Sequence, residues 1–98
     1  MKVVWSAKAL ARLREIHDYI AQDSPQRAKT VVDRLTARSM TLAHPPLTGR
    51  RVPEYPEHDV REVLERPFRL IYRVRPGVID IIVVKHYRQR LSDRPRDL

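Results

Sequence analysis

The sequence has 98 residues, with 20 basic and 12 acidic side chains and a formal net charge of +8. A chain of this length buries roughly 60–68% of its unfolded surface on folding, enough for one domain without disulfides or metals. It contains no cysteine, which excludes disulfides and thiolate chemistry. The four histidines, at positions 17, 44, 58 and 86, include no i, i+4 pair, which argues against a zinc site. We expect neither a metal nor another cofactor.

The excess of positive charge has two interpretations. A strong positive field raises encounter rates with nucleic acids and acidic proteins. An ordinary solvated surface accounts for the same composition. The 2 glycines and 1 phenylalanine argue against a glycine-rich phosphate loop or an aromatic platform for bases. The longest apolar run, residues 81–84, is too short to cross a membrane, and residues 1–5 are too short for a signal peptide, so the expected location is cytoplasmic.

The first half of the chain predicts a strand followed by a helical hairpin. Residues 2–5 are apolar and β-branched, as in a short strand, and Ser6 can cap the helix after it. Ser24 and Pro25 suit the N-cap and first position of a second helix, which should end at the prolines of residues 44–46. Because the connection between the two helices is short, we expect them to lie antiparallel.

The second half predicts a loop and three strands. Residues 44–59 hold four prolines and one glycine and have the character of an ordered surface loop. Strands are expected at residues 59–65, 68–75 and 78–86. Residues 87–98 are charged and are expected to be frayed or weakly docked, with 88–98 as a flexible basic tail. The predicted fold is α+β in a single domain, residues 1–98, with order β-α-α-β-β-β and a helical hairpin on a twisted antiparallel four-stranded sheet.

Helical and strand periodicity together predict the core beneath the hairpin. Its expected members are Leu10, Leu13, Ile16, Ile20, Val31, Val32, Leu35, Leu42, Leu70, Tyr72, Val74, Ile79, Ile81 and Val83.

The turn at Pro76 and Gly77 predicts how the last two strands pair. A loop of two or four residues places Leu70 opposite Val83, Tyr72 opposite Ile81 and Val74 opposite Ile79, all facing the helices. Lys85 would also face the helices. The other face would carry Arg69, Arg73 and His86, and Arg61 would join them from the neighbouring strand. Such a face could bind an anion, or it could be an ordinary surface on which Arg73 pairs with Asp80.

Four segments carry a further resemblance. Residues 18–21 with residues 23–28 form a helical-hairpin signature, and residues 44–50 form a P-x-x-G-R loop. Residues 60–63 and 68–74 are similar to V-R-E-L and Y-R-I-V-Y-R-V strands, and residues 81–90 to a closing I-L-x-V-x-H-x-x-R strand. Over about residues 3–90, the four together resemble the ParE branch of the RelE/ParE toxins, the toxin halves of bacterial toxin–antitoxin pairs.

The resemblance implies a function and a set of partners. Toxins of the ParE branch are associated with inhibition of DNA gyrase by binding, with no catalytic residues of their own and no small-molecule substrate. The resemblance implies a cognate ParD-like antitoxin with an acidic segment that folds on binding. It also implies that operator DNA is reached only through the antitoxin, and that no membrane is involved.

Two groups of residues are candidates for these contacts. For the antitoxin they are Trp5, Arg12, Arg14 and Tyr19, on the first strand and the first helix. For the target they are Arg88, Arg90, Arg94 and Arg96, in a basic arm that could grip a protein–DNA complex by charge. Plain packing or a solvated surface is the alternative for each group.

The RelE branch provides the competing hypothesis, a ribosome-dependent mRNA endoribonuclease. Such an enzyme needs a general acid or base and cationic groups around the phosphate. The sequence could supply them from Arg61, Arg69, Arg73, His86 and Tyr87. Acidic residues among these arginines, such as Glu62 and Asp80, would weaken an RNA surface, which favours the binding toxin.

Overall fold

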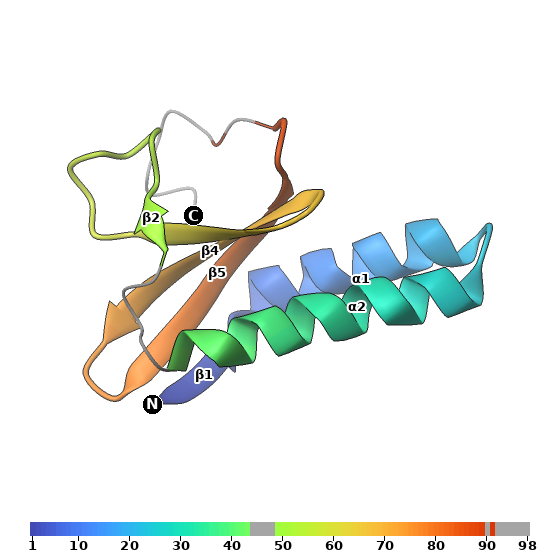
Figure 1. Ribbon diagram of the computed structural model, residues 1–98, viewed down its shortest axis with the longest axis horizontal. Helices are drawn as coiled ribbons and strands as arrows, with labels where there is room; N and C mark the ends of the chain where they lie inside the picture. The colour runs from blue at the N-terminus through green and yellow to red at the C-terminus, as the bar shows by residue number, and fades with distance from the viewer. Residues whose placement is uncertain (44–48, 90, 92–98) are drawn as a thin grey trace.

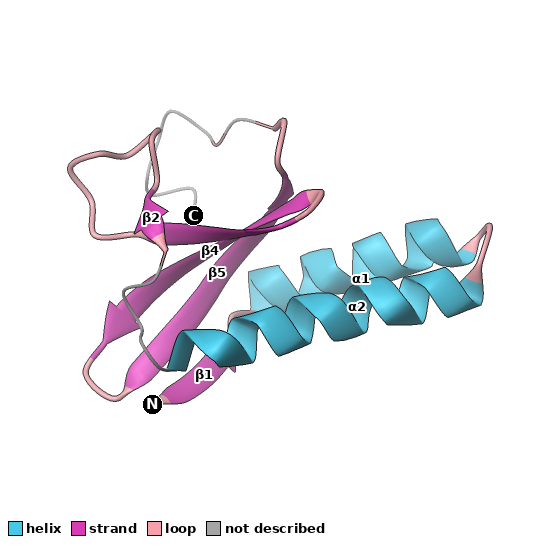
Figure 2. Cartoon of the chain, viewed as in Figure 1, coloured by secondary structure: helices cyan, strands magenta, loops and turns pink. Residues whose placement is uncertain are grey.

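The computed structural model describes residues 1–43, 49–89 and 91 of the chain. A helical hairpin lies on one face of a five-stranded sheet whose strand order is β1-β5-β4-β3-β2 (Figures 1 and 2). The elements are β1 (Lys2–Trp5), α1 (Ala7–Ala21), α2 (Pro25–Met40), the 3-10 turn η1 (Thr41–Ala43), β2 (Arg50–Arg51), β3 (Arg61–Glu65), β4 (Phe68–Arg75) and β5 (Val78–His86). The α+β class and the hairpin are confirmed. Within the described part of the chain, no helix is long and apolar enough to cross a membrane.

Both helices begin at the serines that the sequence indicates. The Ser6 side chain accepts a hydrogen bond from the Ala9 N–H, and the Ser24 side chain accepts one from the Arg27 N–H. These bonds satisfy backbone donors that the first helical turn leaves without a partner. Pro25 occupies the first turn of α2, where its missing N–H costs nothing. Regular α-helix ends at Met40, ahead of the predicted end at residues 44–46, which lie outside the described residues.

The prediction of a fully antiparallel, four-stranded sheet is wrong in two respects. β1 pairs with β5 in parallel, with Lys2 opposite Val78. This is possible because the two helices return the chain before the sheet resumes, as parallel strands require. In addition, the short strand β2 pairs antiparallel with β3 and adds a fifth strand.

The pairing of β4 with β5 agrees with the prediction in one half and departs from it in the other. Tyr72 is opposite Ile81 and Val74 is opposite Ile79, as expected. Beyond them an irregularity between Ile71 and Tyr72 shifts the register by one, so Leu70 lies opposite Val84 and not Val83. A bulge of this kind adds one residue to one strand and re-aims the side chains that follow it.

The bulge is understandable because this sheet has an apolar core on each face. The cluster on the helix side contains Leu13, Ile16, Leu35, Leu70, Tyr72 and Val84 among its members. The cluster on the far face contains Val52, Tyr55, Val60, Ile71, Ile82, Val83 and Leu91. The extra residue lets Ile82 and Val83 both join the far-face cluster. Val83 is therefore core, but on the face opposite to the predicted one.

Except for Leu10, the remaining predicted core residues divide into two groups. Those of the first group are buried: Leu13, Ile16, Leu35, Leu42, Leu70, Tyr72, Ile79 and Ile81. Those of the second group pack partly buried against the same cluster: Ile20, Val31, Val32 and Val74. Leu10 was predicted wrongly, because its side chain is 50% exposed on the outer side of α1. The position has helical spacing, but Ala9 is the residue of that turn that faces the sheet.

Candidate functional site

The most deeply buried charged side chains gather on the far face of the sheet, around Arg69. Its Nε donates to Glu62 Oε2 at 2.5 Å, and its two terminal nitrogens donate to the two oxygens of Glu54 at 2.9 Å each. We call Arg69, Glu54 and Glu62 the Arg69 cluster. Arg69 Nη1 also donates to the Gln89 carbonyl oxygen, and Glu54 Oε2 accepts the Leu91 N–H, each at 3.0 Å. The cluster therefore ties the loop after β2 and the segment after β5 to the middle of the sheet.

The electrostatics of the cluster are those of a closed ion network. The hydrogen bonds from Arg69 are the main reason that the pKa of Glu54 falls from 4.5 to about 2. The bond to Glu54 is likewise the main cause that raises the pKa of Arg69. All three nitrogens of Arg69 are engaged and the residue is 5% exposed. Arg69 therefore stabilises the fold and does not present its charge to a ligand.

The basic face predicted for the sheet does not assemble. Arg61 lies opposite Tyr72, which places it on the helix side, where its Nη1 donates to the Gly49 carbonyl oxygen at 3.0 Å. The shift in register also moves His86, which lies opposite Phe68 on the helix side. Lys85, predicted on the helix side, is opposite Arg69.

Arg73 does stay on the far face, opposite Asp80, but the predicted ion pair between them is replaced by another. Arg75 donates two hydrogen bonds to Asp80, one of them from Nη2 at 3.0 Å, and this contact lowers the pKa of Asp80. Asp80 is therefore paired with Arg75, which lies two residues after the expected partner, Arg73, on β4. Arg73 is left exposed at the turn end of the hairpin.

The segment after β5 carries a short stack of side chains. The rings of His86 and Tyr87 stack with centroids 5.0 Å apart, and the Arg88 guanidinium lies 5.4 Å from the centroid of the Tyr87 ring. Arg88 Nε also donates to the Tyr87 hydroxyl at 3.0 Å. Of the four predicted target-binding arginines, Arg88 is described and exposed. Arg90, Arg94 and Arg96 lie outside the described residues.

The helix side presents a largely apolar hollow of about 480 Å3. Its lining consists of Arg12, Glu15, Ile16, Tyr19, Ile20, Phe68 and His86. Tyr19 is 75% exposed, and Arg12 is held by Glu15 at 3.3 Å on the same helix. Two of the predicted antitoxin-binding residues thus share one surface. Trp5 does not belong to it, because its ring is half-buried against the helix-side core and its Nε1 donates to Ser39 on α2 at 3.2 Å.

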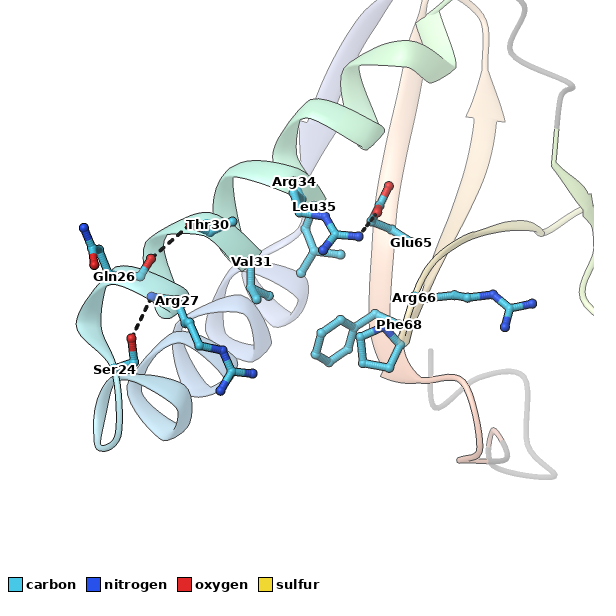
Figure 3. A pocket seen from close by; sticks show the side chains of 11 residues that line it. Ser24, Gln26, Arg27, Thr30, Val31, Arg34, Leu35, Glu65, Arg66 and Phe68 are labelled. Atoms are coloured by element: carbon cyan, nitrogen blue, oxygen red, sulfur yellow. Dashed lines mark hydrogen bonds and ion pairs between the residues drawn. The ribbon is translucent and has the colours of Figure 1, made fainter.

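A second hollow of about 450 Å3 lies between α2 and the turn that joins β3 to β4 (Figure 3). Val31, Leu35 and Phe68 form its apolar floor, and Arg34 crosses to Glu65 at 2.8 Å. Figure 3 shows Arg66 pointing away from α2, and Arg27 lying near Ser24 at the start of α2. Phe68 lines both hollows, so the tip of the β3–β4 turn separates them.

Sequence reasoning missed two residues that make close contacts with the sheet. Glu54 is an acid in a proline-rich loop, and nothing in its spacing connects it to Arg69. Gly49, in the P-x-x-G-R segment, packs so closely that a Cβ there would meet the Glu62 carbonyl oxygen at 2.5 Å. An isolated glycine beside a strand can signal such a close approach. No group of three potential metal ligands comes together within the described ranges.

Comparison with known proteins agrees with this architecture. Residues 3–91 match the family described as the ParE toxin of the type II toxin–antitoxin system parDE. Toxin RelE2 of Caulobacter vibrioides is 36% identical over 86 residues, which are 87% of this chain and 93% of that toxin. A relative from Sinorhizobium fredii is 33% identical over 91 residues and covers 91% of each chain.

A solved structure has the same fold. It is described as the chromosomal ParDE toxin–antitoxin system from P. aeruginosa, and its matching chain superposes with a TM-score of 0.74 at 29% identity. The match covers 88% of this chain and 95% of that one.

Proposed function

This chain belongs to the ParE toxin family of type II toxin–antitoxin systems, and we propose that it inhibits DNA gyrase by binding, without catalysis. We further propose that it acts in the cytoplasm and is neutralised by a cognate ParD-like antitoxin with an acidic segment. The solved relative is a ParDE pair, which supports an antitoxin partner for this chain.

The observation that supports binding over RNA cleavage is the dispersal of the candidate catalytic residues. Arg69 is buried between two carboxylates, and Arg61 lies on the other face against Gly49. Arg73 and His86 lie near opposite ends of the β4–β5 hairpin. Asp80, the residue opposite Arg73, is separated from His86 by roughly 20 Å of strand at about 3.3 Å per residue.

Cleavage of RNA requires an acid or base and cationic groups that act on one phosphate. Positions this far apart, on two faces of a sheet, do not meet that requirement. A toxin that works by occupying a surface of its target has no such constraint.

The direct test is the supercoiling of relaxed plasmid by purified gyrase in the presence of the toxin. We expect supercoiling to stop when toxin is in molar excess, and mRNA on ribosomes to remain intact. Normal supercoiling together with codon-specific mRNA cuts would replace this proposal with the RelE-type endoribonuclease.

The hollow on α1 supports the antitoxin part of the proposal. Tyr19 and Ile20 offer apolar contacts to an amphipathic helix. Arg12, which contacts Glu15 on the same helix, offers a positive charge that an acidic segment can share. We expect a Tyr19→Ala, Arg12→Glu double variant to weaken the antitoxin complex by at least tenfold, on the order expected for hot-spot residues. Arg73→Glu, on the other face of the sheet, is the matched control and should bind normally. Unchanged affinity of the double variant would place the antitoxin elsewhere.

A further inference from the structure

The far face of the sheet has a groove that neither the antitoxin proposal nor the family match assigns. It is a hollow of about 320 Å3 between the loop after β2 and the segment after β5. Arg50, Pro53, Leu64, Tyr87 and Arg88 form its walls, and Arg69 and Glu54 lie at its floor.

Two exposed apolar side chains face this groove. Leu64 and Tyr87 are each 41% exposed, although both are large hydrophobic residues. Leu64 lies opposite Arg69 on the neighbouring strand, so it stands directly beside the cluster. A leucine and an aromatic ring left open in one hollow are typical of a protein-binding surface.

The exposed charge of the groove is positive. Glu54 is 10% exposed and Glu62 is 1% exposed at the side chain, and both are held by Arg69. Arg50 also contacts Glu62, but its own side chain is 65% exposed. Among the described residues, no carboxylate forms an ion pair with Arg88. An approaching partner would therefore meet Arg50 and Arg88 and not the acids beneath them.

This combination of charge and chemistry indicates the occupant. A surface for duplex DNA would consist mainly of basic and polar groups, since phosphates are its main contacts. Tyrosine and arginine are instead enriched where proteins bind one another, and with Leu64 as an apolar contact they suit an acidic protein segment with an apolar anchor.

The geometry holds this groove in shape from below. Arg69 Nη1 bonds the Gln89 carbonyl and Glu54 bonds the Leu91 N–H, so the cluster fixes the backbone on both sides of residue 90. Tyr87 N–H donates to the Pro67 carbonyl at 2.7 Å, which fixes the start of the same segment. Tyr87 and Arg88 are thereby presented by a segment that is tied to the sheet.

We propose that the groove between Leu64 and Tyr87, with Arg50 and Arg88 at its rim, is the surface that binds an acidic protein segment of the toxin's target. This deepens the proposed function and rests on it for the identity of the target. The groove lies on the sheet face opposite the α1 hollow proposed for the antitoxin. Toxicity and antitoxin binding should therefore be separable by substitution.

The test is a Leu64→Thr, Arg88→Glu double variant of the full chain. Both residues are exposed, and threonine suits a strand, so the variant should fold and melt within a few degrees of the wild type. The matched control is Leu10→Ala, Arg27→Glu, which removes another exposed leucine and reverses another exposed arginine, both on the helices.

We expect the double variant to lose growth arrest in a bacterial host and to bind purified gyrase, without DNA, at least tenfold more weakly, on the order of a hot-spot loss. Its affinity for the antitoxin should stay within about twofold, and the control should be as toxic as the wild type.

Full growth arrest by the double variant would contradict the proposal that this groove binds the target. So would normal binding to gyrase combined with lost binding to duplex DNA, which would make the groove a nucleic-acid surface. If the wild type arrests growth but leaves gyrase supercoiling normal, the gyrase proposal fails. The growth arrest of the double variant, compared with that of the control, still tests whether the groove binds the target.

Discussion

The backbone N–H of Gly49 donates a hydrogen bond to the hydroxyl oxygen of Tyr72 at 2.9 Å. This contact joins the loop before β2 to the middle of β4, and Tyr72 is fully buried there. Arg61 donates to the carbonyl oxygen of the same glycine. Gly49 thus donates a hydrogen bond to β4 and accepts one from β3. The glycine of the P-x-x-G-R motif thus has a structural reason: its backbone is bonded to the sheet on both sides.

Gly49→Ala should destabilise the protein by about 1–3 kcal/mol, the usual cost of overpacking. The added Cβ would lie 2.5 Å from the Glu62 carbonyl oxygen and 2.7 Å from the Tyr72 hydroxyl, and backbone cannot yield easily. Urea denaturation measures the loss. Gly77→Asn is the control, because Gly77 has a positive φ of 74° with open space around it, and asparagine tolerates that conformation. Equal stability of the two variants would contradict the close packing.

Arg69→Met should cost about 3–5 kcal/mol at neutral pH, because it removes the cation that Glu54 and Glu62 share and leaves Glu62 with only the exposed Arg50. Adding Glu54→Gln and Glu62→Gln should recover part of this loss, since the triple variant has no buried charge to compensate. Chemical denaturation of the three proteins gives the comparison. If the triple variant is no more stable than Arg69→Met alone, the Arg69 cluster is not held by charge.

Acid should weaken the fold through Glu54. Its pKa is about 2 in the folded chain and 4.5 in the reference state, so the folded form favours the charged carboxylate. The stability that this carboxylate contributes is complete above pH 4.5 and is lost as the pH falls toward 2. Thermal melts between pH 6 and about 2 should show the decline. A Glu54→Gln variant should show a shallower decline, and a parallel curve would assign the acid sensitivity to other groups.

Leu35→Ala should cost about 2–5 kcal/mol, because Leu35 is 1% exposed in the helix-side core. Leu10→Ala removes the same atoms from a side chain that is 50% exposed, and should cost below about 0.5 kcal/mol. The two denaturant midpoints, compared with the wild type, give both values. A Leu10 variant as unstable as the Leu35 variant would restore the sequence prediction that Leu10 is core.

Arg73→Gln should leave gyrase inhibition within about twofold of the wild type. Arg73 is exposed at the turn end of the hairpin and does not line the far-face groove. An endoribonuclease that used Arg73 as a phosphate clamp should lose roughly 100-fold or more. Loss of toxicity on that scale, with the fold intact by circular dichroism, would favour the enzyme.

Local sequence signals predicted the elements well, for physical reasons that act over short distances. Ser6 and Ser24 cap their helices through bonds to residues three positions away, and strict alternation marked β4. The hairpin register was correct next to its turn, from Tyr72 to Val74, because the turn fixes it there. It was wrong beyond the bulge. There the register shifts by one residue because Ile82 and Val83 pack into the far-face core, and no local sequence pattern indicates that core.

The site was less predictable because its contacts are made between distant segments. Arg69 alternates correctly for a basic face, but Glu54 and Glu62 neutralise it from a loop and a neighbouring strand. His86 was assigned to the same face, and a shift of one residue placed it on the other. Charge counts alone could not distinguish the buried Arg69 from the exposed Arg88.

Because β1 pairs with β5, the first strand to be synthesised has no partner until the final strand of the sheet has left the ribosome. Pairing between such distant segments is slow, since the entropy of closing the intervening chain is lost before the contact forms. The helices can form early, yet the sheet beneath them stays incomplete until β5 has been synthesised. The far-face groove, with walls from β3 and from the segment after β5, is absent from the growing chain until then. A cell making this protein would be protected from it until that segment has left the ribosome.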